Sequence, residues 1–160
     1  MEIHLLAIGT KMPDWVNKGY AEYAGRLSGK SCKARLLLKE IPAEKRVKNS
    51  DIKKLREKES GKLINAIPAG SHIVALDVLG QPWSTEKLAS HMENWMMSGK
   101  NIALLVGGPE GMTRECVQQA DQVWSLSPLT FPHPLVRVIL AEQLYRAWSI
   151  TENHPYHRAG

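Results

Sequence analysis

The chain has 160 residues, 43% of them hydrophobic and 23% charged, so we expect one globular domain over residues 1–160. Its net charge of +5 favours a polyanionic partner but does not identify one. The sequence shows no apolar run near the roughly 20 residues of a membrane span and no secretory pattern, and its only cysteines are Cys32 and Cys116. We therefore expect a cytoplasmic protein without membrane contact, disulfide framework or thiolate metal site.

Strand-like and helix-like segments alternate along the whole chain. We expect five strands, over Ile3–Ile8, Ala34–Ile41, Ile73–Asp77, Ile102–Val106 and Gln122–Leu126. The first three helices between them begin with Pro13 at the first position and extend to Leu27, run from the capping residues 49–51 to about Ile67, and run from the cap Ser84 to the stop at Gly99. A short helix over Thr113–Ala120 and a final helix over Leu135–Ile150 complete the chain. Strands separated by helices predict an α/β fold with a mostly parallel sheet flanked by helices.

Basic residues crowd one segment between the second and third expected strands. They are Lys45, Arg46, Lys48, Lys53, Lys54, Arg56, Lys58 and Lys62. The first part of this segment, Pro42–Ser50, is polar and basic and is expected to form a surface loop. A second basic group, Arg137, Arg146 and Arg158, belongs to the last third of the chain.

A glycine-rich turn, Gly107–Gly111, follows the fourth expected strand and precedes a helix. Glycines at such a place let backbone N–H groups approach a ligand closely, although a tight turn without a ligand would use them too. The turn lacks the Lys-Ser/Thr ending of a phosphate-binding loop and the spacing of the dinucleotide fingerprint.

A second turn, Leu126–Pro134, contains three prolines and His133 between a strand and a helix. Proline fixes φ and removes N–H groups, so this loop has a rigid path that can present its remaining amides and carbonyls to a flat heterocycle such as adenine. A helix that begins near Pro134 would explain that proline, but not the other two prolines or His133. Both turns end strands, which is where open α/β sheets bind ligands.

The final helix has apolar residues over a wide arc, which indicates burial in the core or in a subunit interface. Its polar exceptions include Glu142 and Arg146, which are four residues apart and could simply pair. In the tail, His154 and His157 lack a further ligand nearby, so no metal site is expected. Tyr156, His157 and Arg158 are residue types that stack on bases and contact phosphates.

Together these stretches resemble the ribosomal large-subunit methyltransferase H family of the SPOUT superfamily. The matching stretches are Ile8–Val16, Leu104–Gly111, Trp124–Val138 and Glu142–Arg158, and the resemblance covers nearly the whole chain. It implies a single SPOUT methyltransferase domain with an α/β knot, a deep C-terminal trefoil knot, and a homodimer. It also implies that S-adenosylmethionine donates a methyl group to N3 of a pseudouridine in a stem-loop of 23S rRNA within the assembled ribosome.

The resemblance also assigns residues. The S-adenosylmethionine pocket would be lined, largely through backbone, by Leu76, Gly108, Ser127, Pro128, Leu129, Thr130, Phe131 and Pro132. The tail would complete the active site opposite the cofactor of the partner subunit. We expect Tyr156 or His157 to stack on or position the base, and Arg146 and Arg158 to hold phosphates or a ring carbonyl.

Two questions stay open at this stage. His133 is a candidate general base, or alternatively a structural histidine that holds its loop by hydrogen bonds. The alternative function is a non-catalytic ribosome-binding or assembly factor with the same fold, whereas a nucleotide-using enzyme of another class is disfavoured by the missing phosphate motifs.

Overall fold

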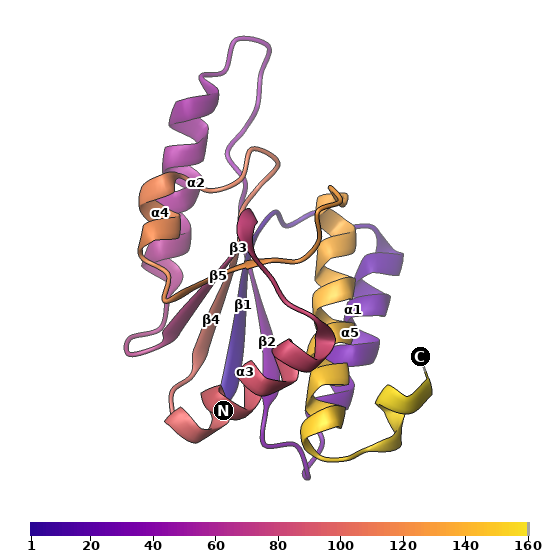
Figure 1. Cartoon of the computed structure of the whole chain (residues 1–160). Coiled ribbons are helices and arrows are strands. Elements are labelled where there is room, and N and C mark those ends of the chain that lie inside the picture. The colour runs from indigo at the N-terminus through magenta and orange to yellow at the C-terminus, as the bar shows by residue number, and fades with distance from the viewer. Residues whose placement is uncertain (160) are drawn as a thin grey trace.

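The computed structural model describes residues 1–159, and within them one five-stranded parallel sheet forms the centre of the molecule (Figure 1). The strands are β1 (Glu2–Ile8), β2 (Arg35–Ile41), β3 (His72–Pro82), β4 (Ile102–Val106) and β5 (Gln122–Ser125). Their order across the sheet is β2-β1-β4-β3-β5. The predicted α/β class with a parallel sheet is therefore confirmed.

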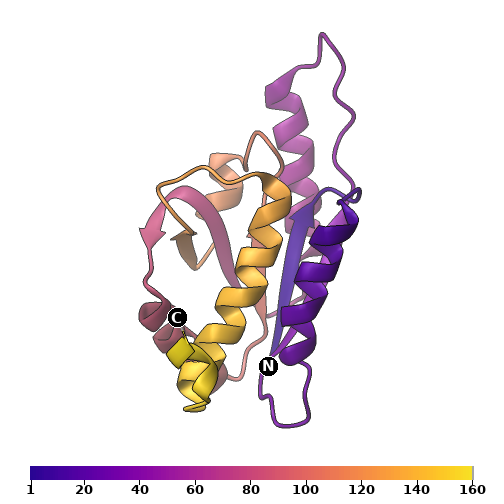
Figure 2. The ribbon, with the colours of Figure 1, turned by 90° about the vertical axis from the view of Figure 1, so that its right-hand side faces the viewer.

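Helices cover both faces of this sheet, as Figures 1 and 2 show. They are α1 (Asp14–Arg26), α2 (Ile52–Ala66), α3 (Thr85–Ser98), α4 (Arg114–Gln118) and α5 (His133–Thr151), followed by the 3₁₀ helix η1 (Pro155–Ala159). Helix α5 packs beside α1 and α3 on one face, and α2 contacts α4 on the other. Among the described helices, none is long and apolar enough to cross a membrane.

The central strands are apolar on both sides because both faces of the sheet are covered. Successive side chains of a strand point to opposite faces. In β1, Ile3, Leu5 and Ala7 accordingly join the core under α1, α3 and α5. Leu6 and Ile8 join the smaller core on the other side. The sheet is thus fixed from both faces, and the loops at its carboxyl edge extend from a rigid base.

Most predicted helix ends are confirmed. The side chains of Asp51, Ser84 and Thr113 each accept a hydrogen bond from a backbone N–H three residues later. Gly99 ends α3 in the left-handed conformation with φ of 70°. Pro13 is different: it is the residue before the first helical position, not the first position itself.

Strand β3 is longer than predicted, because it continues past Asp77 to Pro82 through an irregularity between Leu76 and Gln81. Gly80 makes this path possible, since a Cβ there would lie 2.7 Å from the backbone of Val123. The irregular segment leaves the side chains of Val78 and Leu79 exposed beside the carboxyl edge.

An aromatic cluster joins α3 to the end of β5. The Trp83 ring stacks on Trp124 with centroids 5.0 Å apart, and on its other side meets His91 at 4.0 Å. The side-chain oxygen of Gln122 accepts a hydrogen bond from Trp95 Nε1 at 2.9 Å, and its amide group contacts His91 Nδ1 at 3.1 Å. These contacts fix β5 just before the chain enters the Leu126–Pro134 loop.

Candidate functional site

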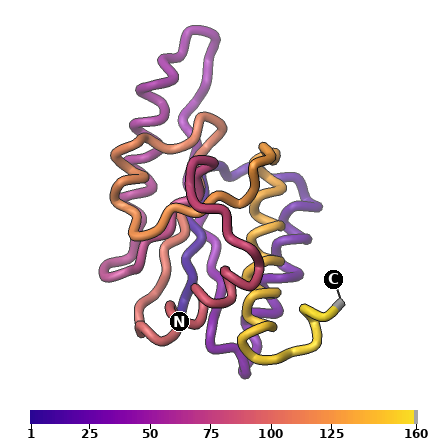
Figure 3. The backbone as a smooth tube through the Cα atoms, viewed as in Figure 1, coloured from indigo at the N-terminus to yellow at the C-terminus, as the bar shows by residue number. Residues whose placement is uncertain are grey.

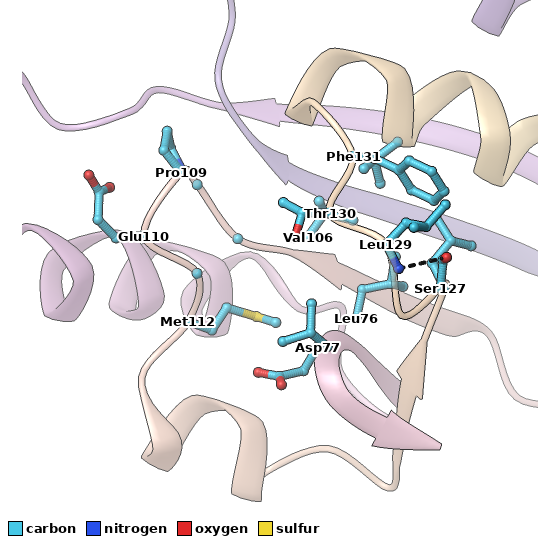
Figure 4. A pocket seen from close by; sticks show the side chains of 16 residues that line it. Leu76, Asp77, Val106, Pro109, Glu110, Met112, Ser127, Leu129, Thr130 and Phe131 are labelled. Atoms are coloured by element: carbon cyan, nitrogen blue, oxygen red, sulfur yellow. Dashed lines mark hydrogen bonds between the residues drawn. The ribbon is translucent and has the colours of Figure 1, made fainter. Parts of the chain in front are cut away.

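A cavity of about 350 Å³ opens at the carboxyl edge of the sheet, where β3, β4 and β5 end (Figure 4). One wall is the loop that carries Pro109, Glu110 and Met112, and the facing wall is the loop that carries Leu129 and Phe131. The full lining is Leu76, Asp77, Val78, Val106, Gly107, Gly108, Pro109, Glu110, Gly111, Met112, Leu126, Ser127, Leu129, Thr130, Phe131 and Val136. The cavity is thus mostly apolar, with backbone groups and a few polar side chains at its rim, as small-molecule sites are.

The loop after β4 presents its backbone to the cavity, because a side chain at Gly107 or Gly108 would collide with neighbouring atoms. A Cβ on Gly107 would lie 2.8 Å from the backbone carbon of Gly111, and one on Gly108 would lie 2.8 Å from Glu59 Oε1. The turn is closed by a hydrogen bond from Gly111 N–H to Gly108 O at 2.9 Å. Gly111 itself has φ of 75°, which favours glycine.

An ion-pair network supports this loop from behind. Glu59 of α2 is 1% exposed, and its Oε1 accepts a hydrogen bond from Arg46 Nη2 at 3.0 Å. The same guanidinium donates to Glu110 in the cavity loop, with Nε 3.0 Å from Oε2. These hydrogen bonds hold the pKa of the Glu110 carboxyl below its ordinary value and raise the pKa of Arg46. The network ties the cavity loop to α2 and to the loop that follows β2.

The facing loop combines a rigid path with free amides. Ser127 Oγ accepts a hydrogen bond from Leu129 N–H at 3.0 Å, which folds the loop tip on itself. Within residues 1–159, the backbone N–H groups of Thr130 and Phe131 have no hydrogen-bond partner. These amides are free to pair with the edge of a heterocycle held between the two loops.

The structure brings six of the eight predicted cofactor residues to one cavity: Leu76, Gly108, Ser127, Leu129, Thr130 and Phe131. The other two do not line it. Pro128 belongs to the loop tip, and Pro132 is the N-terminal flanking residue of α5. Sequence reasoning missed Asp77 and Met112, although Asp77 is the last residue of the expected strand Ile73–Asp77, and that position is a signal that could have indicated it.

His133 lies outside the cavity lining and fastens α5 to the end of β1. Its Nε2 donates to Ile8 O at 2.6 Å, and burial keeps the pKa of His133 below its ordinary value. One helical turn later the fully buried Arg137 donates to Gly9 O at 2.7 Å and to Glu40 Oε2 at 2.6 Å. Of the two readings left open for His133, this contact supports the structural one.

The tail residues gather against the distal half of α5. Tyr156 Oη donates to Glu142 Oε1 at 3.1 Å, and the Arg146 guanidinium lies 5.0 Å from the Tyr156 ring centre. Burial, together with neighbours that include Glu142, raises the pKa of Tyr156 to about 12. Tyr156 is therefore neutral at physiological pH, and its hydroxyl is used within the chain as a hydrogen-bond donor to Glu142.

Glu142 and Arg146 also form the predicted i,i+4 pair, with Arg146 Nε 2.8 Å from Glu142 Oε1. His157 Nδ1 is 3.3 Å from Ser149 Oγ, and Arg158 donates to Asn153 at 3.3 Å. No group of three or more potential metal-binding side chains occurs in the described part of the chain.

The tail and the cavity lie at opposite ends of α5. Val136 at its start lines the cavity, whereas Ser149 near its end contacts His157. Thirteen residues separate them, which is about 20 Å along a helix axis. Within one chain, the predicted cofactor residues and the predicted RNA-contacting tail therefore do not form a single site.

Comparison with known proteins gives a consistent result. A family model described as a predicted SPOUT methyltransferase matches residues 1–157. Over 158 residues the chain is 58% identical to a protein of Thioalkalivibrio sulfidiphilus (strain HL-EbGR7) named ribosomal RNA large subunit methyltransferase H, covering 99% of both chains. A protein of Marinomonas sp. (strain MWYL1) with the same name is 54% identical, and the match covers 99% of this chain and all of that one.

Among solved structures, a methylase family protein from Neisseria gonorrhoeae is similar in fold, with a TM-score of 0.50 and 13% identity. The match covers 89% of this chain and 81% of that one.

Proposed function

Because the chain belongs to the SPOUT methyltransferase family, we propose that it methylates N3 of a pseudouridine in a stem-loop of 23S rRNA within the assembled ribosome. Two relatives that match over their full length are named ribosomal RNA large subunit methyltransferase H, which supports an rRNA substrate. The alternative of a non-catalytic assembly factor is not favoured by these names. A cytoplasmic location and the trefoil knot remain predictions.

S-adenosylmethionine is the proposed methyl donor, and the cavity at the carboxyl edge is its proposed site. The apolar lining and the free N–H groups of Thr130 and Phe131 suit an adenine ring read by backbone. The glycine backbone of residues 107–111 lets the rest of the molecule lie close to the loop. When bound there, the sulfonium group would supply an electrophilic methyl group.

The chain's own residues would hold the base and ease loss of its proton. N3–H of the uracil ring is weakly acidic, so a donor to the flanking ring carbonyls favours the anion. We assign this work to Arg146 or Arg158, with Tyr156 or His157 stacking on or positioning the base. Leaving its own stack costs the target nucleotide a few kcal/mol, which such stacking offsets.

The separation of tail and cavity by about 20 Å along α5 supports a homodimer in which one subunit's tail meets the other's cofactor. Leu135, Ile139, Glu142 and Arg146 follow one another at helical spacing on the side of α5 turned away from the core. All four side chains are half-buried in the single chain, and the first two are apolar. We propose that this outward stripe packs against a second copy of the chain.

Deleting residues from Tyr156 onward tests the assigned roles. We expect near-normal binding of S-adenosylmethionine by calorimetry and loss of methyl transfer to ribosomes that lack the modification, by roughly 100-fold or more. Loss of cofactor binding as well would show that the tail is only structural. Wild-type protein that neither binds the cofactor nor transfers methyl would refute the function itself.

Mixed dimers test whether the site is shared. One subunit would carry Gly107→Ala, which damages the cofactor loop, and the other would lack the tail. One of the two sites in such a dimer has both an intact loop and an intact tail, so we expect activity to return to about half of the wild-type level. Absence of any activity in the mixture would contradict a site shared between subunits.

A further inference from the structure

One projecting segment carries nearly all of the chain's net charge. Residues 42–62, here named the basic arm, comprise the loop after β2 and most of α2. The arm holds eight of the 21 Lys and Arg residues but four of the 16 Asp and Glu residues, so it alone accounts for +4 of the net +5. The remaining residues are nearly neutral. The positive field of the molecule is therefore local.

The arm extends beyond the carboxyl edge of the sheet, away from the rest of the molecule (Figures 1 and 3). Figure 2, at right angles, shows the same projection. At its base, Arg46 binds Glu110 of the cavity lining with Nε 3.0 Å from Oε2. Glu59, which pairs with Arg46 at this base, is seven residues from Ile52, the first residue of α2, so the helix continues about 10 Å beyond the rim. The arm therefore starts at the cavity rim and extends outside it.

The lysines at the tip of the arm are presented to solvent without ion-pair partners. Lys48, Lys53 and Lys54 are exposed, and within residues 1–159 no carboxylate forms an ion pair with them. The arm's base is different, because Lys62 pairs there with Glu44 at 2.7 Å. The charges at the base are used within the fold, whereas those at the tip are free.

The placement of two of these lysines is unfavourable for the fold. Lys53 and Lys54 lie in the first turn of α2, which contains no acidic residue. A cation at that end opposes the helix dipole. The N-cap carboxylate of Asp51, which accepts a hydrogen bond from Lys54 N–H, offsets part of this effect, but within residues 1–159 no carboxylate forms an ion pair with either ammonium group. Val47 and Ile52 beside them are 60% and 43% exposed. The two cations are therefore available to a partner.

We propose that the basic arm binds RNA phosphates outside the stem-loop that enters the cavity, and so helps to select the assembled ribosome. This inference rests on the proposed rRNA methylation. The arm begins at the cavity rim, so RNA reaching the cavity passes beside it. Lys53 and Lys54 lie six and five residues before Glu59 in α2, which is about 8–9 Å along the helix axis, so they reach phosphates beside the cavity and not the nucleotide inside it. Free RNA carrying only the target loop lacks the phosphates that the tip contacts.

The test compares two variants with the same change in net charge. The arm variant carries Lys48→Gln, Lys53→Gln and Lys54→Gln. The control carries Lys30→Gln, Lys33→Gln and Lys100→Gln, which are exposed lysines near the amino ends of the strands. Binding to assembled ribosomes from cells lacking the protein is measured at about 50–200 mM KCl, the range in which phosphate contacts weaken steeply. Calorimetry with S-adenosylmethionine and the thermal unfolding midpoint check both proteins.

We expect the arm variant to bind ribosomes about tenfold or more weakly than the control, with the slope of log K against log salt smaller by about 2. The KM for ribosomes should rise with kcat unchanged. Cofactor affinity and the unfolding midpoint should match in the two variants. Equal ribosome affinity and equal slope would overturn the inference. So would weaker binding of the arm variant to phosphatidylserine vesicles alone, which would assign the arm to a membrane surface.

Failure of this inference is separable from failure of the proposed function. If the wild-type protein methylates 23S rRNA and the two variants behave alike, only the role of the arm is wrong. If the wild-type protein shows neither cofactor binding nor methylation, the proposed function itself is wrong.

Discussion

At the scale of single residues, two buried charges hold the carboxyl edge together. Arg137 is fully buried and joins Gly9 O and Glu40, while Glu59 is almost fully buried and binds Arg46. Burying a charge costs several kcal/mol unless it is paired and hydrogen-bonded, so each pair is expected to be intolerant of losing one partner. The sequence marks Arg137 only as one of the basic residues in the last third of the chain. Its partners lie 97 and 128 residues away, beyond any local pattern.

We expect the free energy of unfolding to depend on pH through His133. Its folded pKa lies below the ordinary 6.5 because burial disfavours the imidazolium, so the unfolded chain takes up a proton first as pH falls. The neutral imidazole therefore contributes to the free energy of unfolding above about pH 6.5. This contribution is lost as pH falls through the pKa of His133 in the folded protein. We expect the difference in free energy of unfolding between wild type and His133→Gln to shrink from about pH 7.5 to 5.5 in urea titrations. A constant difference would contradict this.

At the scale of elements, the sequence predicts regular segments well and irregular ones poorly. Strand β4 occupies Ile102–Val106, as predicted, because its apolar run has clear turn signals on both sides. The continuation of β3 past Asp77 depends on Gly80 meeting the backbone of Val123, which is a tertiary contact. No local sequence pattern predicts helix η1 either, because it depends on a tertiary contact, that of Tyr156 with a side chain of α5.

The candidate site shows the same difference between local sequence signals and long-range contacts. Two Gly/Pro-rich turns at strand ends located the cavity, and six of its predicted residues line it. The supporting pair of Arg46 and Glu110 could not be predicted, because 64 residues separate them. That separation is closed only when α2 and the loop after β4 pack on the same face of the sheet.

Two glycine-to-alanine changes should have opposite effects. In Gly107→Ala the new Cβ meets backbone of Gly111 at 2.8 Å, so the cofactor loop must move, and we expect at least about tenfold weaker S-adenosylmethionine binding. Gly61 in α2 has nothing within 4 Å of such a Cβ. Gly61→Ala should therefore raise the free energy of unfolding by about 0.5–1 kcal/mol. Calorimetry and urea titration measure the two effects.

Normal cofactor affinity in Gly107→Ala would show that the loop does not contact the ligand. A destabilised Gly61→Ala protein would show that α2 needs glycine for a reason outside the single chain.

At the scale of the whole molecule, the two sides of α5 differ in how well they are covered. Its inner side packs on the sheet between α1 and α3, with Leu140, Leu144 and Trp148 buried. Its outward stripe is only half-covered in the single chain. The wide apolar arc that the sequence indicated is thus partly explained by the core, and the proposed dimer accounts for the rest.

A charge placed in the outward stripe should separate the subunits. In Ile139→Glu, a two-fold interface would bring two new carboxylates into a partly desolvated contact, so we expect the dimer dissociation constant to rise by about two orders of magnitude. Sedimentation velocity measures it. Met97→Glu, at a position in α3 that is 83% exposed, is the matched control and should leave assembly unchanged. A wild-type protein that sediments as a monomer, or an Ile139→Glu protein that stays dimeric, would refute the proposed interface.

The stacked indoles of Trp83 and Trp124 give the molecule a built-in optical probe. Their ring centres are 5.0 Å apart at an interplanar angle of 13°, close enough for their electronic transitions to couple. Both rings border a recess shared with Leu126 and Phe131, which also line the cavity at the carboxyl edge. A ligand that shifts this loop would change the surroundings of the pair. We therefore expect intrinsic fluorescence and near-ultraviolet circular dichroism to change when the cavity of the unlabelled protein is filled.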